Sequence, residues 1–263
     1  MKFANVNGQR QEAQPRLSGA CQVCGSPVIA KCGRVRVWHW AHLTKLICDV
    51  WWENEGEWHR TWKSHFPESW QEIVHLTEDG TKHIADVKTE DGWVIEFQRS
   101  RISPEERESR DTFYKKLVWV VDATRMARDT AQFAKALQTG SPITGNPNIR
   151  RVRADECKLI QEWSGSPKLR LLFFDFGGEQ PLWWLLAGRP DEPMYVGQWS
   201  RADFIAAAHG KGPEKSRNFH ELLWLLLRSV MADYTRLNPR AVEQAPARPI
   251  SAPRYFVRRK FRL

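Results

Sequence analysis

Residues 82–98 read KHIADVKTEDGWVIEFQ, two runs with strand-like alternation joined by a short polar turn. The turn Glu90-Asp91-Gly92 fits a three-residue hairpin loop, with glycine at the position that needs a positive φ. This loop places Asp86 opposite Glu96. A two-residue loop on Asp91-Gly92 would mix polar and apolar side chains on each face, so the apolar pattern favours the first register.

In this register one face of the hairpin is polar and the other is largely apolar. The polar face carries Asp86, Lys88, Glu96 and Gln98. Two carboxylates across a sheet repel each other unless a cation lies between them. A divalent cation of the Mg²⁺ or Mn²⁺ type prefers such oxygen ligands and would activate a water molecule against a phosphodiester. The alternative interpretation is an exposed hairpin whose acids are neutralised by Lys88.

The elements around the hairpin follow the order α-β-β-β-α-β. We predict a helix over 53–66, a strand over 72–77, the hairpin strands, a helix over 103–115 and a buried strand over 117–121, followed by a further helix over 124–137. Ser103 and the following proline give that helix a strong N-terminus. The first helix offers Glu53, Glu55 and Glu57, one of which could complete the ligand set. His59 of the same helix could transfer a proton or contact phosphate.

Several motifs in a fixed order resemble the competence protein CoiA-like family over roughly residues 18–125. They are EWHRTWKSHFP at 57–67, HIADVK at 83–88, IEFQ-x-S-x-IS-x-x-E at 95–106, Arg110, Tyr114 and VWVVD at 118–122. The resemblance implies a nuclease-like domain of the PD-(D/E)XK superfamily, a restriction-endonuclease-like core. That core has the α-β-β-β-α-β order reached above from the patterning alone.

The resemblance also implies roles for single residues. Asp86 and Glu96 match the superfamily's metal ligands, and Glu57 is the helix carboxylate that completes them. Gln98 stands where many members have lysine, and glutamine can orient a water or phosphate but cannot act as a base. The hairpin register places Lys88 on the same face, where it would supply the missing charge. Lys63 of the first helix is expected to contact nucleic acid.

Two short motifs near the N-terminus, Cys21-x-x-Cys24 and His39-x-x-His42, predict a closed tetrahedral zinc site. A full set of protein ligands makes this Zn²⁺ structural rather than catalytic. The segment resembles the zinc-binding segment of the CoiA-like family. Cys32 and Cys48 are rival ligands, and the alternative interpretation is a set of ordinary buried cysteines and histidines. Five cysteines without an export signal favour a reducing, cytoplasmic location, and no apolar run predicts membrane insertion.

We therefore predict a mixed α+β (α/β) fold in four parts. A zinc-binding segment spans 1–48, the nuclease-like core 49–140, a small C-terminal α+β module 150–235 and a disordered tail 236–263, with a linker at 140–148. The net charge is +9, and the tail has eight basic residues and one acidic residue. The tail is expected to bind nucleic acid through Arg254, Arg258, Arg259 and Lys260, or to be only a solvated segment.

The sequence leads to two hypotheses from different classes. The first is a metal-dependent DNA nuclease acting in DNA uptake processing, recombination or mobile-element defence. The second is a nucleic-acid-binding accessory protein that keeps the nuclease scaffold with little or no turnover, because Gln98 replaces the lysine. In a weaker third hypothesis, the module at 150–235 would dock protein partners within a larger assembly.

Overall fold

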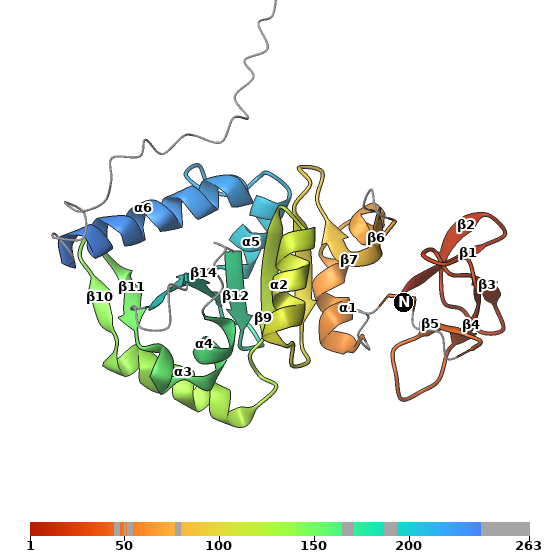
Figure 1. The fold of residues 1–263 in the computed structure, drawn as a ribbon, viewed down its shortest axis with the longest axis horizontal. Helices are drawn as coiled ribbons and strands as arrows, with labels where there is room; N and C mark the ends of the chain where they lie inside the picture. The colour runs from red at the N-terminus through yellow and green to blue at the C-terminus, as the bar shows by residue number, and fades with distance from the viewer. Residues whose placement is uncertain are drawn as a thin grey trace, which may run out of the picture.

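The computed structural model describes residues 1–44, 48–49, 51, 55–76, 80–164, 171–186 and 194–237. These residues form two sheets, and the smaller N-terminal sheet lies to one side of the larger body (Figure 1). The small sheet is antiparallel, with the order β2-β1-β3-β4-β5. Its strands are β1 (Phe3–Val6), β2 (Gln9–Glu12), β3 (Ser18–Ala20), β4 (Pro27–Lys31) and β5 (His39–His42).

The larger sheet has nine strands in the order β10-β11-β14-β13-β12-β9-β8-β7-β6. The three neighbours β8, β9 and β12 run parallel, and the remaining pairs are antiparallel. Its strands are β6 (Gln71–Leu76), β7 (Lys82–Lys88), β8 (Val94–Gln98), β9 (Leu117–Asp122), β10 (Ser141–Ile143), β11 (Asn146–Val152), β12 (Leu171–Asp175), β13 (Leu182–Leu186) and β14 (Met194–Trp199).

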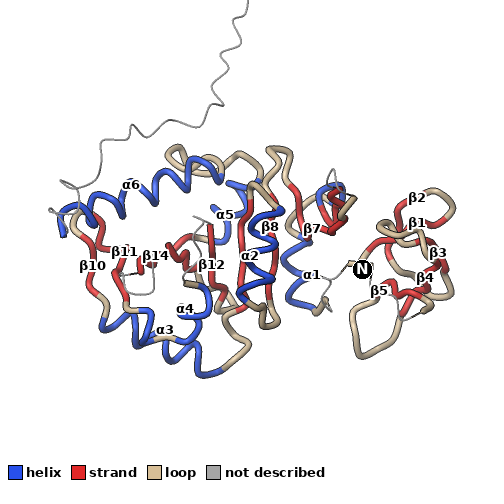
Figure 2. Tube along the Cα trace, viewed as in Figure 1, coloured by secondary structure: helices blue, strands red, loops and turns tan. Residues whose placement is uncertain are grey.

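Helices cover both faces of this sheet, because side chains that alternate along its central strands enter two separate cores. One core includes side chains from α1 (Glu57–Ser64), α5 (Arg201–Ala208) and α6 (Phe219–Leu237). The opposite core includes side chains from α3 (Ala127–Thr139), α4 (Lys158–Trp163) and the end of α2 (Pro104–Phe113). Figure 2 shows α6 and α3 on opposite sides of the strands. The fold is mixed α+β, as expected.

The hairpin at 82–98 has the predicted register. Val87 pairs with Ile95, the amide of Thr89 donates to the carbonyl of Trp93 across the loop, and Gly92 has a φ of 78°. The predicted cap of α2 is also present, since the Ser103 hydroxyl accepts from the Glu106 amide at 3.1 Å. The alternating pattern of residues 82–98 therefore predicted the register of this hairpin correctly.

The sheet departs from regular geometry at the level of Asp86. The facing residue on β6 is Glu72, whose φ of 46° lies in the left-handed region that non-glycine residues seldom occupy. Ala85 and Val87 are two residues apart, yet they enter cores on opposite faces of the sheet, so β7 rotates locally at Asp86. Such irregularities re-aim side chains, and this one turns Asp86 and Glu72 toward α1.

Two predictions about the chain's organisation are corrected by the structure. Residues 140–148, expected to be a linker, contribute β10 and the start of β11, which pair around a turn at Gly145. Residues 150–235 do not form a separate module, because β12 pairs in parallel with β9 and extends the sheet of the core. Strand β12 is buried along its whole length and needs neighbours on both edges, which a small separate module would not provide.

None of the helices in the described ranges is long and apolar enough to span a lipid bilayer. The predicted helix start at Glu53 and the basic tail, including Arg254, Arg258, Arg259 and Lys260, lie outside the described residues.

Candidate functional site

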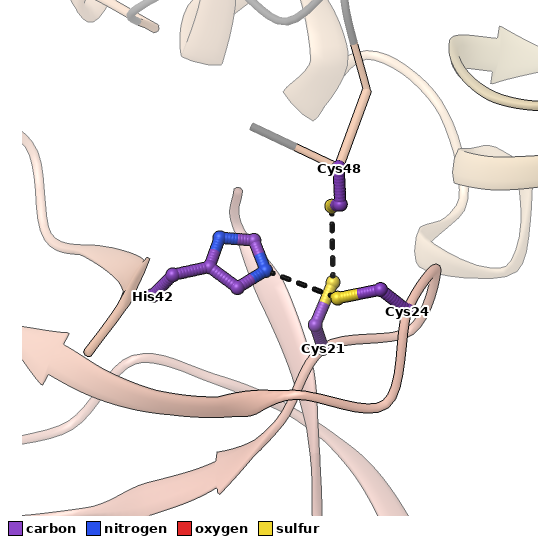
Figure 3. A group of neighbouring side chains, drawn as sticks. All are labelled: Cys21, Cys24, His42 and Cys48. Atoms are coloured by element: carbon purple, nitrogen blue, oxygen red, sulfur yellow. Dashed lines mark hydrogen bonds between the residues drawn. The ribbon is translucent and has the colours of Figure 1, made fainter. Parts of the chain in front are cut away.

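Four side chains of the N-terminal region converge on one point (Figure 3): Cys21, Cys24, His42 and Cys48. Their sulfur and nitrogen atoms all lie within 4.8 Å of one another. The Sγ atoms of Cys21 and Cys48 are 3.7 Å apart, and the Sγ of Cys24 is 3.3 Å from Nε2 of His42. In the part of the chain that the structure describes, this is the one group of three or more potential metal ligands at such short range.

These distances fit tetrahedral zinc. Zn–S bonds of about 2.3 Å separate two thiolates on a tetrahedron by about 3.8 Å, close to the spacing of Cys21 and Cys48. Burial raises the pKa of Cys24, but hydrogen bonds from Ser26 and His42 lower it to about 6. Burial and the neighbouring Cys21 raise the pKa of Cys48. In the absence of a cation only part of this group can ionise, whereas Zn²⁺ would hold all three sulfurs as thiolates.

The fourth ligand differs from the prediction. His39 and His42 are three positions apart on β5, so their side chains leave the strand on opposite faces. His39 Nδ1 lies 2.9 Å from the carbonyl of Val37, and Cys48 takes the fourth place in the cluster. Sequence reasoning named Cys48 only as a rival, because an isolated cysteine has no spacing motif.

Asp49 joins this cluster to the larger sheet. Its carboxylate accepts from the amide of Ile84 on β7 at 2.8 Å and contacts Nδ1 of His83 at 2.8 Å. Asp49, which follows the cluster ligand Cys48, is therefore hydrogen-bonded to Ile84, two positions before Asp86 on β7. The Glu72 carboxylate makes a second link, since it accepts from the amides of Lys2 and Phe3 on the small sheet at 2.6 and 3.0 Å.

A small polar cavity of about 50 Å³ lies beside the rotated part of β7. It has room for a few water molecules. Of the residues predicted for the catalytic site, Asp86, Glu96, Gln98 and His59 line it. Other carboxylates at its wall, which the prediction did not assign, are Asp49, Glu55 and Glu72.

Asp86 is held by three groups from two elements, β8 and α1. Its Oδ2 accepts from the Phe97 amide at 2.9 Å and lies 3.3 Å from Nε2 of His59, and its Oδ1 lies 3.8 Å from Nζ of Lys63. Burial raises the pKa of Asp86, but His59, Lys63 and the Phe97 amide outweigh it and leave the pKa below its ordinary value. Asp86 is therefore charged at neutral pH.

The pKa of Glu96 is raised, whereas that of Asp86 is lowered. Burial and the nearby Asp86 raise the pKa of Glu96 to about 8, although Nη1 of Arg110 lies 3.2 Å from its Oε2. Oε1 of Glu96 accepts from the Asp86 amide at 3.4 Å, so the two predicted metal ligands are neighbours. A buried carboxyl beside a charged carboxylate favours its protonated form, which accounts for this shift.

The helix carboxylate differs from the prediction. Helix α1 begins at Glu57, whose side chain is exposed at the first turn and does not line the cavity. Glu55 precedes the cap residue Gly56 and lines the cavity instead, paired with Lys63 and, at 2.6 Å, with Arg60. The predicted helix began four residues earlier, and the sequence favoured Glu57 over Glu55, which the same segment also offered.

Neither predicted lysine has the expected role. Lys63 is fully buried between Glu55, Glu72 and Asp86, so it cannot contact a nucleic acid in this structure. Lys88 lines a different pocket with His75 and does not reach the cavity, because the rotation at Asp86 breaks the simple alternation of faces. Gln98 does lie at the cavity, and its Nε2 donates to the Ser100 carbonyl at 3.0 Å.

Asp175 has a structural function that the sequence did not reveal. It ends β12, and its Oδ2 accepts from the indoles of Trp58 and Trp62 on α1 at 2.9 and 2.8 Å. Arg201 of α5 also pairs with it. This carboxylate thereby holds α1, the helix that carries His59 and Lys63, against the sheet.

Residues 9–50 match the profile described as "Competence protein CoiA, N-terminal domain". This N-terminal region is CoiA-like. The CoiA-like region contains the whole Cys21, Cys24, His42 and Cys48 cluster, whereas the cavity around Asp86 lies beyond the matched residues. Searches of curated proteins and of solved structures gave no match.

Asp86 and Glu96 fit the role of ligands for a catalytic cation. Mg²⁺ is often held by one or two carboxylates, with waters and phosphate oxygens completing its octahedron. The cavity supplies two adjacent carboxylates and room for water. This donor set is all oxygen, so it differs in kind from the sulfur-rich cluster of the CoiA-like region.

Proposed function

We propose that this protein is a divalent-metal-dependent DNA nuclease with a competence-related role, in DNA uptake processing, recombination or mobile-element defence. The CoiA-like N-terminal region supports the competence-related part. The observation that carries the nuclease part is the pair Asp86 and Glu96 in one cavity, where the pKa of Glu96 is raised to about 8 by burial and by Asp86. Structural Zn²⁺ on the cysteine and histidine cluster would fix the region beside that cavity.

The roles of the chain's own residues follow from their contacts. Asp86 and Glu96 would hold Mg²⁺ or Mn²⁺, which when bound supplies Lewis-acid stabilisation of the phosphodiester and an acidified water. Lys63 holds Asp86 in place from the buried side. His59 has Nε2 at Asp86, and its Nδ1 is buried with no hydrogen-bond partner among the described residues. His59 would assist the reaction from this position beside Asp86.

The test is cleavage of single-stranded and double-stranded DNA with Mg²⁺ or Mn²⁺. We expect cleavage by the wild type, loss of at least about a hundredfold in Asp86→Asn, and little change in Glu57→Gln, which alters an exposed carboxylate at the start of α1. Equal cleavage by wild type and Asp86→Asn would defeat the proposal, because a contaminating nuclease would then explain the activity.

A second candidate is a DNA-binding accessory protein without useful turnover. Gln98 favours it, since this side chain cannot act as a base and is held by Ser100. Binding that weakens steeply with salt and persists without Mg²⁺ or Mn²⁺, together with no cleavage under any condition, is its signature.

A further inference from the structure

The loop that joins β4 to β5, residues 32–38, has the sequence CGRVRVW and projects from the small sheet (Figure 1). We call it the basic loop. Val35 at its tip is 95% exposed. The loop contains two arginines, two valines and a tryptophan. A simple connection between two strands of this short sheet would not need these side chains.

Trp38 is the aromatic residue of the basic loop, and 48% of its surface is exposed. Its indole nitrogen donates to the Gly33 carbonyl at 3.2 Å, which closes the loop and satisfies the polar edge of the ring. The ring is thus held by the loop itself while much of its surface meets solvent. A fixed, exposed aromatic ring is a platform on which an unpaired base can stack.

The charge around this ring is positive. Arg34 and Arg36 are exposed, and within the described residues neither has an acidic group at ion-pair distance. The stretch 31–43 also contains Lys31 and no aspartate or glutamate. Exposed guanidinium groups contact phosphates and an exposed indole stacks on bases, so these three side chains supply both kinds of contact that a single strand offers.

The basic loop is connected to the cavity described above. Arg60 of α1 donates to the carbonyl of Trp38 at 3.0 Å, and its Nε pairs with Glu55 at the cavity wall at 2.6 Å. The preceding residue, His59, contacts Asp86. At the other end of β5, His42 belongs to the candidate zinc cluster, which would hold the base of this hairpin.

We propose that the basic loop is a binding site for single-stranded DNA, in which Trp38 stacks on a base and Arg34 and Arg36 contact phosphates. The loop would deliver the strand toward the cavity of Asp86 and Glu96. The choice of DNA as ligand rests on the proposed function, but binding by this loop does not require cleavage.

The test is fluorescence anisotropy with labelled single-stranded and duplex DNA, in a buffer without Mg²⁺, Mn²⁺ or chelator. We expect Trp38→Ala to weaken single-strand binding by about 5-fold or more and duplex binding much less. Trp38→Phe keeps a stacking ring and should retain most of the affinity. The double change Arg34→Ala, Arg36→Ala should reduce the slope of log K against log salt by about 1.4.

The matched control is Trp224→Ala, because Trp224 is an exposed tryptophan of α6 with 43% of its surface accessible. It should bind both DNAs like the wild type. Zinc content and circular dichroism would verify that each variant folds. Unchanged single-strand affinity in Trp38→Ala, or an equal loss for single-stranded and duplex DNA, would overturn the proposal. Both readouts are independent of turnover, so absence of cleavage would leave this site standing.

Discussion

The carboxylate of Asp86 accepts a hydrogen bond from the backbone amide of Phe97 at 2.9 Å. The ladder between β7 and β8 pairs Val87 with Ile95 and Lys88 with Val94, and the side chain of Asp86 continues it where the two backbones diverge. Asparagine can accept the same bond, but alanine leaves a buried amide unpaired. We expect Asp86→Ala to lose about 1–3 kcal/mol more stability than Asp86→Asn in urea unfolding. Equal stabilities would show that the Phe97 amide finds another acceptor.

At neutral pH the buried Glu96 lowers the free energy of unfolding of the protein. Its pKa rises from 4.5 to about 8 on folding, because of burial and Asp86. A raised carboxyl pKa favours the folded state at low pH, and this advantage is lost as pH rises from about 4.5 to about 8. We expect Glu96→Gln to be more stable than the wild type at pH 8 and to show a smaller gain at pH 5. Urea midpoints in metal-free buffer measure this, and a gain that does not grow with pH would contradict it.

The zinc ligand set can be tested by comparing a variant of a cluster residue with a variant of a residue outside the cluster. We expect Cys48→Ser to lose most of its bound zinc, and His39→Gln to retain about one zinc per chain, since His39 leaves β5 on the other face. Elemental analysis of the purified proteins measures both. Cys32→Ser serves as the control for removal of a thiol outside the cluster. Zinc loss in His39→Gln with retention in Cys48→Ser would restore the ligand set expected from the sequence motifs.

Two neighbouring glutamates should differ sharply in their effect on stability. Glu55 balances the buried Lys63, so Glu55→Gln should cost about 3 kcal/mol, whereas the exposed Glu57→Gln should stay within about 0.5 kcal/mol. Chemical denaturation at pH 7 gives both values. Similar costs would mean that Glu72 and Asp86 are enough to balance Lys63.

Asp175 should stabilise the attachment of α1. Burial raises the pKa of Asp175, but Arg201, the Gly177 amide and the two indoles leave it below 3.8. A lowered pKa gives stability that is present above about pH 4 and is lost as pH falls further. We expect Asp175→Asn to cost about 3 kcal/mol at pH 7 and less at pH 3. A cost that is the same at both pH values would assign the effect to packing instead of charge.

The hairpin and the order of elements could be predicted because the relevant rules are local. Alternation over 82–98 has a period of two, and the loop at Gly92 restricts the register to one choice. Cys48 could not be selected in the same way, because its place in the cluster depends on Asp49 binding β7, far along the chain. Glu55 lines the cavity in place of the favoured Glu57 because α1 begins later than predicted. Periodicity determines the ends of helices poorly.

The nine-stranded sheet was missed for a related reason. The parallel pairing of β9 with β12 joins Val118 to Leu171 across more than fifty residues, and no local pattern encodes such a pairing. The apolar run of β9 indicated a strand covered on both faces, but not the identity of its second neighbour. The rotation at Asp86 was hidden too, since it arises where Glu72 adopts a left-handed backbone on the facing strand.

The position of β9 between β8 and β12 has a practical consequence for work on this protein. A fragment that stops at residue 140 would contain every residue of the Asp86 cavity, yet it would expose the edge of β9 that β12 covers. An uncovered edge of a strand rich in apolar side chains recruits strands from other molecules. We expect such a fragment to aggregate before it could be assayed, so a cleavage assay on residues 1–140 alone would be negative whatever the activity of the full chain.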